Sequence, residues 1–148
     1  MSGTTDPRLE LSEEMFKAVK YWESIVNSLT NRIKNDHLKD ITDIQAEAIS
    51  YRQKAIEEVR TYSIKIHKLV QKMKVLHKAK FEFYSTSYQV KTNGTEKLRL
   101  IEADLSENQA FINELDEHVN FLRDTAKNLE SINYAIKGKI ELYNIIGA

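Results

Sequence analysis

The sequence predicts an elongated all-α protein built from long helices. Only four Gly and one Pro occur in 148 residues, whereas charged residues make up 30% of the chain. Few turn-forming residues and many charges are typical of long, solvated helices. Apolar residues also recur at spacings of three and four along most of the chain, which is the period of an amphipathic helix. A chain of this length fits one domain.

The N-terminal part predicts a tail followed by a first helix. We expect residues 1–11 to be a disordered tail and residues 12–148 to form a single helical domain. Ser12, followed by two Glu residues, suits the N-cap and first turn of a helix. The polar run at residues 35–37 predicts a turn or kink. The apolar stripe between these limits comprises Met15, Val19, Trp22, Val26 and Leu29.

The middle of the chain predicts one long helix over about residues 40–80. Its apolar stripe, from Ile41 to Leu76, has a near-heptad spacing that requires a partner helix along its length. The helical pattern degrades over residues 81–95, which contain Ser, Thr and the turn pair Asn93-Gly94. A loop or a short extended hairpin is expected there.

The C-terminal segment, residues 96–148, has the cleanest apolar seam and predicts a coiled-coil-like helix. Asn108 and Asn133 interrupt the seam, and Asn at such core positions fixes register and strand number. A single chain with so few turns cannot bury a seam of this length, so we expect a homo-oligomer. The predicted oligomerisation residues are Leu105, Asn108, Ile112, Leu115, Val119, Leu122, Leu129, Asn133, Ile136 and Ile140.

Charge is distributed unevenly although the formal net charge is zero. Residues 60–95 carry about +7, from eight Lys and Arg against one Glu, and both flanking segments are acidic. Seven of these cations fall between Arg60 and Lys80 with no intervening acid, and aromatic residues follow. Cations neutralise phosphates and aromatic rings stack on unpaired bases. The predicted nucleic-acid-binding residues are Lys78, Lys80, Lys74, Arg60, Phe83 and Tyr84.

Simpler interpretations of this basic and aromatic segment stay open. The cations could form an ordinary solvated helix face, and the aromatic rings could cap the hydrophobic core. The rest of the sequence argues against an enzyme, because it has no phosphate-binding Gly loop, no nucleophile motif and no Cys. Its four His are scattered, so we expect neither a metal nor a cofactor. No signal peptide or membrane span is apparent, which predicts a soluble intracellular protein without a membrane partner.

The order of these features resembles the UvsY family of recombination mediators from T-even-like bacteriophages. The resemblance covers roughly residues 45–148 and is carried by two segments, Lys78-Ala79-Lys80-Phe81-Glu82-Phe83-Tyr84-Ser85 and Tyr134-Ala135-Ile136-Lys137-Gly138-Lys139-Ile140-Glu141. The family's DNA-binding motif has a Lys-Ala-Arg core, and Lys78 and Lys80 occupy its two basic positions. Lysine at the second position keeps the charge but lacks the planar fork of arginine.

The resemblance implies a non-enzymatic function in DNA recombination and repair. A family member would bind single-stranded DNA, assemble as a ring-like homo-oligomer and help a RecA-like recombinase replace a single-strand-binding protein. It would act in the cytoplasm of the infected bacterial host. The alternative is a structural or scaffolding coiled-coil protein that binds no nucleic acid and whose cations pair with the acidic helices of its neighbours in the assembly.

Overall fold

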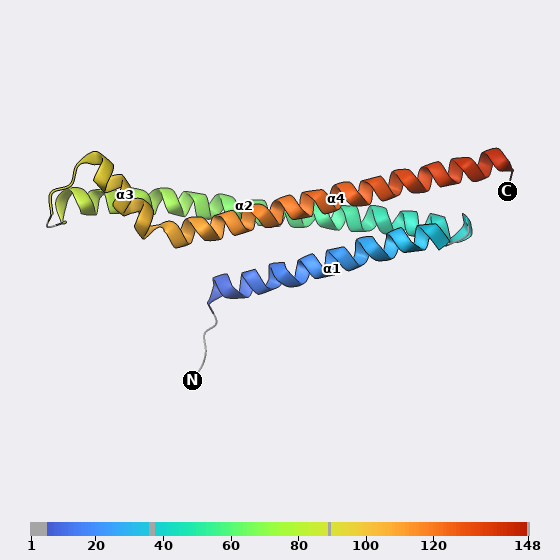
Figure 1. The fold of residues 1–148 in the computed structure, drawn as a ribbon, viewed down its shortest axis with the longest axis horizontal. Helices are drawn as coiled ribbons and strands as arrows, with labels where there is room; N and C mark the ends of the chain where they lie inside the picture. The colour runs from blue at the N-terminus through green and yellow to red at the C-terminus, as the bar shows by residue number, and fades with distance from the viewer. Residues whose placement is uncertain (1–5, 36–37, 89, 148) are drawn as a thin grey trace, which may run out of the picture. The chain divides into compact units, whose positions relative to one another are not determined.

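The computed structural model describes residues 6–35, 38–88 and 90–147, and within them all regular structure is helical. The elements are α1 (Pro7–Asn35), α2 (Leu38–Thr86), α3 (Gly94–Asp104) and α4 (Ser106–Ile146) (Figure 1). The predicted all-α class is confirmed. The extended hairpin considered for residues 81–95 does not form in the described part of that segment, because α2 continues to Thr86.

The helices form two compact units. Unit 1 comprises the described residues of Met1–Arg60 and His118–Ala148, and unit 2 comprises those of Thr61–Glu117. Helices α2 and α4 each contribute one part to unit 1 and another part to unit 2.

Helix α1 begins earlier than the sequence predicted. The side chain of Asp6 accepts a hydrogen bond from the backbone amide of Arg8 (3.0 Å), so Asp6, and not Ser12, caps the helix. Pro7 occupies the first helical position, where its missing N–H costs nothing. Residues 7–11 of the predicted tail are therefore helical, and residues 1–5 lie outside the described part of the chain.

Unit 1 is a bundle of α1 with parts of α2 and α4. Large apolar side chains are fully buried in it, and on α1 and α4 they recur every seven residues. Small buried Ala side chains on α2 allow neighbouring helices to approach closely. Buried apolar residues of this bundle include Met15, Trp22 and Leu29 on α1, Ile41, Ile44, Ala48 and Ala55 on α2, and Leu122, Leu129 and Ile136 on α4.

Polar contacts fix the neighbouring helices of unit 1 in an antiparallel register. The indole Nε1 of Trp22 donates to a carboxylate oxygen of Glu58 at 2.9 Å. Near the C-terminal end of α1, Arg32 and Glu47 form an ion pair at 2.7 Å. A hydrogen bond to a charged group satisfies the buried indole, and such bonds are stronger than those between neutral groups.

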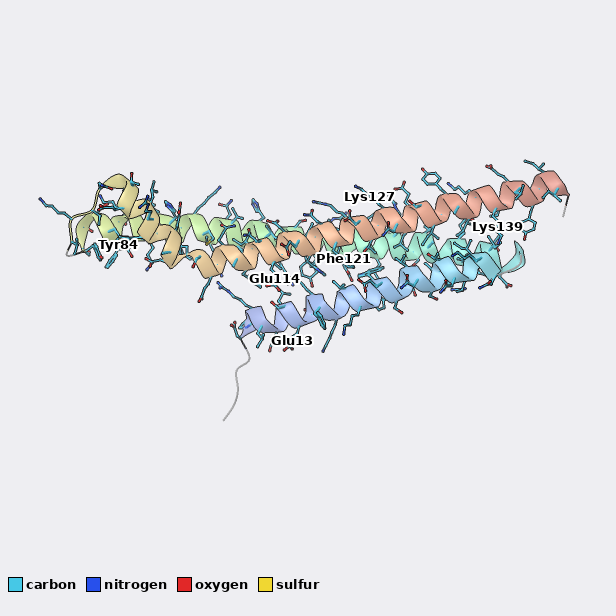
Figure 2. The ribbon with its side chains drawn as sticks, in the orientation of Figure 1. Glu13, Tyr84, Glu114, Phe121, Lys127 and Lys139 are labelled. Atoms are coloured by element: carbon cyan, nitrogen blue, oxygen red, sulfur yellow. The ribbon has the colours of Figure 1, made fainter. Side chains whose placement is uncertain are left out.

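Helix α4 is tied to both other helices of unit 1. Gln45 Nε2 on α2 donates to Asn133 Oδ1 (3.1 Å), and Lys139 Nζ donates to the backbone carbonyl of Ile33 (2.5 Å) on α1. Figure 2 labels Lys139 on α4. Asn133 thus has an amide partner within its own chain.

The single chain buries most of the C-terminal seam. Leu105, Ile112 and Leu115 are buried in unit 2. In unit 1 the buried seam residues are Val119, Leu122, Leu129 and Ile136, while Asn108 of unit 2 and Asn133 and Ile140 of unit 1 are half-buried. The expectation that one chain could not bury this seam is wrong, because the chain folds back on itself. The homo-oligomer stays a prediction, but its subunits would have to contact each other through a surface other than this seam.

The structure corrects the predicted boundaries of the C-terminal helix. Helix α3 begins at Gly94 with a capping box, in which Asn93 Oδ1 accepts from the amide of Glu96 (2.8 Å) and the Glu96 carboxylate accepts from the amide of Asn93 (3.3 Å). The predicted single helix over residues 96–148 is broken at Leu105, which separates α3 from α4. The Ser106 hydroxyl donates to the carbonyl of Ala103 (3.0 Å) at this break.

Candidate nucleic-acid interface

The basic face lies on the part of α2 that belongs to unit 2. Lys74 and Lys78 are exposed and four residues apart, so both side chains project from one side of the helix. Lys68 and Lys72 are also exposed but project from a different side of the helix. No Asp or Glu occurs between Glu58 and Glu82, so no acid on this stretch of α2 offsets the charge. This face offers several ammonium groups to an anionic ligand.

An aromatic cluster follows at the end of α2. The ring centroid of Tyr84 lies 5.1 Å from that of Phe83 and 4.9 Å from that of Tyr88, in edge-to-face geometry. The carbonyl of Phe83 accepts from the amides of both Ser87 (2.8 Å) and Tyr88 (3.0 Å), which folds the chain back and brings Tyr88 to the cluster. Phe83 is 45% exposed and Tyr88 is 37% exposed. Two of the three rings are therefore accessible to a stacking base.

One carboxylate in unit 2 engages two of the predicted DNA-binding residues. The Tyr84 hydroxyl donates to Asp104 Oδ2 at 2.6 Å, and the Lys80 ammonium lies 3.5 Å from the same oxygen. The hydrogen bond to Asp104 raises the pKa of Tyr84 to about 12, so the phenol stays protonated at neutral pH. Figure 2 labels Tyr84 near this end of α2. Lys80 is thus paired within the chain, whereas no ion pair of Lys74 or Lys78 is found among residues 6–35, 38–88 and 90–147.

The structure brings together most, but not all, of the predicted binding residues. Lys74, Lys78, Lys80, Phe83 and Tyr84 all lie on the unit 2 part of α2. Arg60 belongs to unit 1, so the interface defined here omits it.

Sequence reasoning missed Asp104. It lies 20 residues or more from its two partners, at the end of a helix that the sequence did not separate from α4. The spacing of residues carries no signal for such a contact, because the contact depends on how α3 packs against α2. Sequence reasoning also missed the cation–π contact of Lys97 on α3, whose Nζ lies 5.5 Å from the Phe81 ring centroid.

Unit 2 also contains a mainly apolar hollow between α2 and the start of α4. It has a volume of about 310 Å³, and Lys74 and His77 contribute its basic groups. The lining residues are Val70, Met73, Lys74, His77, Leu105, Gln109 and Ile112. Lys74 therefore belongs both to the basic face and to the lining of this mainly apolar hollow.

A separate apolar surface lies at the C-terminal end of α4 in unit 1. Tyr134, Leu142, Ile145 and Ile146 are each more than half exposed, and Ile145 reaches 82%. Gly138 lies on the same helix, and a Cβ added there would meet no atom within 4 Å. Exposed apolar patches of this kind are typical of protein interaction sites.

Comparisons with known proteins identify no relative: the chain matches no protein-family model, no curated protein and no solved structure. In the described part of the chain, no three His, Asp or Glu side chains gather to hold a metal ion. None of the helices described here is long and apolar enough to span a membrane.

Proposed function

We propose that this protein is a non-enzymatic, single-stranded DNA-binding recombination mediator. One observation carries the proposal. Unit 2 exposes two lysines, Lys74 and Lys78, and, a few residues further along the chain, two aromatic rings, those of Phe83 and Tyr88. Cations that follow a backbone and rings that stack on unpaired bases are the two components of sequence-independent single-strand binding. The binding energy per protomer is modest and depends on salt.

The narrower role rests on the resemblance to the UvsY family. Under this proposal the protein helps a RecA-like recombinase assemble on DNA covered by a single-strand-binding protein, in the cytoplasm of a bacterium infected by a phage. The Lys-Ala-Lys segment and the C-terminal helix support it, since those two segments carry the resemblance.

Self-association belongs to the same proposal. A homo-oligomer would present several copies of the basic face to one strand, so weak sites would add through effective concentration. The exposed end of α4, with Leu142, Ile145 and Ile146, supports assembly better than the buried seam does. Leu142→Ser with Ile145→Ser should lower the mass measured by light scattering, whereas the parent should exceed the monomer mass. A monomeric parent at micromolar concentration would end this part of the proposal.

The decisive experiment for DNA binding is a fluorescence-anisotropy titration on an unstructured oligonucleotide at several salt concentrations. Lys74→Ala with Lys78→Ala should weaken binding and lower the log–log salt slope by about 1.4, or about 0.7 per lost phosphate contact. The matched control is Lys17→Ala with Lys127→Ala, two exposed lysines of unit 1, which should leave the slope unchanged. An unchanged slope in the unit 2 variant would move the DNA surface elsewhere.

A scaffolding protein without nucleic-acid binding is the second candidate. The Lys80–Asp104 ion pair favours it, because at least one of the unit 2 cations is already compensated within the chain. If every cation of the basic face is compensated by an acidic residue of the protein, the parent protein should show no affinity for the oligonucleotide even at low salt. The same titration therefore separates the two functions.

A further inference from the structure

Lys80 and Tyr84 direct their donors at a single oxygen. They are four residues apart on α2, so their side chains project from the same side of the helix. The Tyr84 hydroxyl is 2.6 Å and the Lys80 ammonium 3.5 Å from Oδ2 of Asp104. One hydroxyl and one ammonium thus converge on one anionic oxygen supplied by α3.

This donor pair suits a phosphate oxygen as well as a carboxylate oxygen. Both ligands are anionic acceptors, and charge-assisted hydrogen bonds to either have similar lengths. Tyr84 is a donor at neutral pH with or without Asp104, because the ordinary pKa of a phenol, about 10, already lies well above 7. The pair therefore has the chemistry of a phosphate site that is filled by an internal anion.

We propose that Asp104 occupies, in the free protein, a site for a DNA phosphate oxygen formed by Lys80 and Tyr84. A strand then engages this site by displacing the Asp104 carboxylate. The inference rests on the proposed function, since it concerns the same interface. It assigns Asp104 the role of an internal competitor that lowers the affinity of the resting protein for DNA.

Displacement is feasible because the ion-pair part of the internal contact is weak. The Lys80 and Asp104 side chains are 42% and 31% exposed, and ion pairs at such exposure are screened by water and salt. A phosphodiester carries the same single negative charge as the carboxylate it replaces, and in a bound strand it would be continuous with phosphates at Lys74 and Lys78. Asp104 therefore sets a threshold for binding and does not prevent it.

Removing the competitor should strengthen DNA binding. Asp104→Asn should bind an unstructured oligonucleotide about two- to fivefold more tightly at low salt, because one nearby negative charge is lost. The salt slope should stay close to that of the parent, because the bound strand contacts the Lys80 site in both proteins. The matched control is Glu102→Gln, which removes the same charge from an exposed position on α3. An equal gain in both variants would show a general charge effect and overturn the inference.

A double-mutant cycle isolates the competition. Lys80→Ala should have a small effect in the parent, where Asp104 holds the ammonium, and a larger one in the Asp104→Asn background. Additive effects, or weaker DNA binding by Asp104→Asn, would overturn the inference. The second result would mean that Asp104 positions Lys80 and Tyr84 for DNA.

An NMR titration of the Tyr84 phenol tests the Tyr84–Asp104 hydrogen bond in the absence of DNA. In Asp104→Asn its pKa should fall from about 12 toward the ordinary value of 10. If the pKa falls while the parent and the variant bind DNA equally, the contact is purely structural and this inference fails, but the proposed function stands. If neither protein binds DNA at low salt, the proposed function fails as well.

Discussion

The two units differ in where their apolar and polar groups lie. Unit 1 contains most of the large side chains that are fully buried, including Trp22, Leu122 and Leu129, and its three helices are joined by hydrogen bonds. Unit 2 contains the acid-free stretch of α2 and leaves Val75, Phe83 and Tyr88 exposed. The difference indicates that unit 1 supplies most of the folding free energy, whereas unit 2 carries the surface to which the proposed function assigns DNA binding.

The largest effect should come from the core of unit 1. Leu122→Ala removes a fully buried side chain and should lower the free energy of unfolding by about 2–5 kcal/mol. The matched control is Leu9→Ala on α1 of the same unit, which is 54% exposed and should change stability by less than about 0.5 kcal/mol. Urea denaturation of both variants measures the contrast. Equal losses would mean that α4 is not held as the structure shows.

A smaller effect should appear in DNA binding by unit 2. Phe83→Ala should cost about 1–3 kcal/mol of binding free energy if a base stacks on this ring, with little change in salt slope. Phe16→Ala is the control, since Phe16 is an exposed ring of unit 1 and should have no effect. Anisotropy titrations compare the two. A comparable loss in both variants would remove the distinction between the units.

The start of α3 gives the next test. Asn93→Ala removes the side-chain acceptor of the capping box and should cost about 1 kcal/mol of stability. Asn27→Ala, at an exposed position within α1, should be nearly neutral or slightly stabilising, because Ala favours the helix interior. Thermal unfolding measures both, and a neutral Asn93→Ala would mean that packing alone holds α3.

The smallest expected effect is a dependence on pH that comes from unit 1. His118 is buried, its ring stacks on Phe121, and burial lowers its pKa while nearby Glu14 partly opposes the shift. The unfolded state therefore binds a proton first as the pH falls below about 6.5, and stability decreases over that window. His118→Gln should reduce this dependence in melts between pH 7.5 and 5.5.

An exposed histidine provides the control for this pH dependence. His67→Gln in unit 2 should leave the dependence as it is in the parent. A parent whose melting temperature does not change over this pH range would contradict the assigned burial of His118.

The sequence predicted the helices better than their ends. The apolar period located the buried stripes of α1, α2 and α4, because burial on one side requires that period. It placed the end of α2 too early, since Ser85 and Thr86 favour turns and the contacts of Lys80 and Tyr84 with α3 are not visible in the sequence. The break at Leu105 was missed because neither Gly nor Pro marks it.

The candidate site was predicted only in part. Composition identified the basic face and the aromatic residues, because both are contiguous along the chain. The pairing of Asp104 with Lys80 and Tyr84, and the burial of the C-terminal seam within one chain, depend on contacts between distant segments. A single sequence gives the faces of its helices but not which helix covers them.

The hydrogen-bonded indole of unit 1 also determines what optical methods can observe. Trp22 is the only Trp in the chain, it is fully buried, and the rings of Tyr21 and Tyr51 lie 5.3 and 6.2 Å from it. Both tyrosines can transfer excitation energy to the indole. Fluorescence emission from the indole therefore reports the bundle around α1. Tyr84 and Tyr88 belong to the other unit, and a ligand that stacks there would quench tyrosine emission while leaving the indole spectrum unshifted. The unmodified protein thus has one indole, which reports on unit 1, and seven tyrosines, of which Tyr84 and Tyr88 report on the aromatic cluster of unit 2.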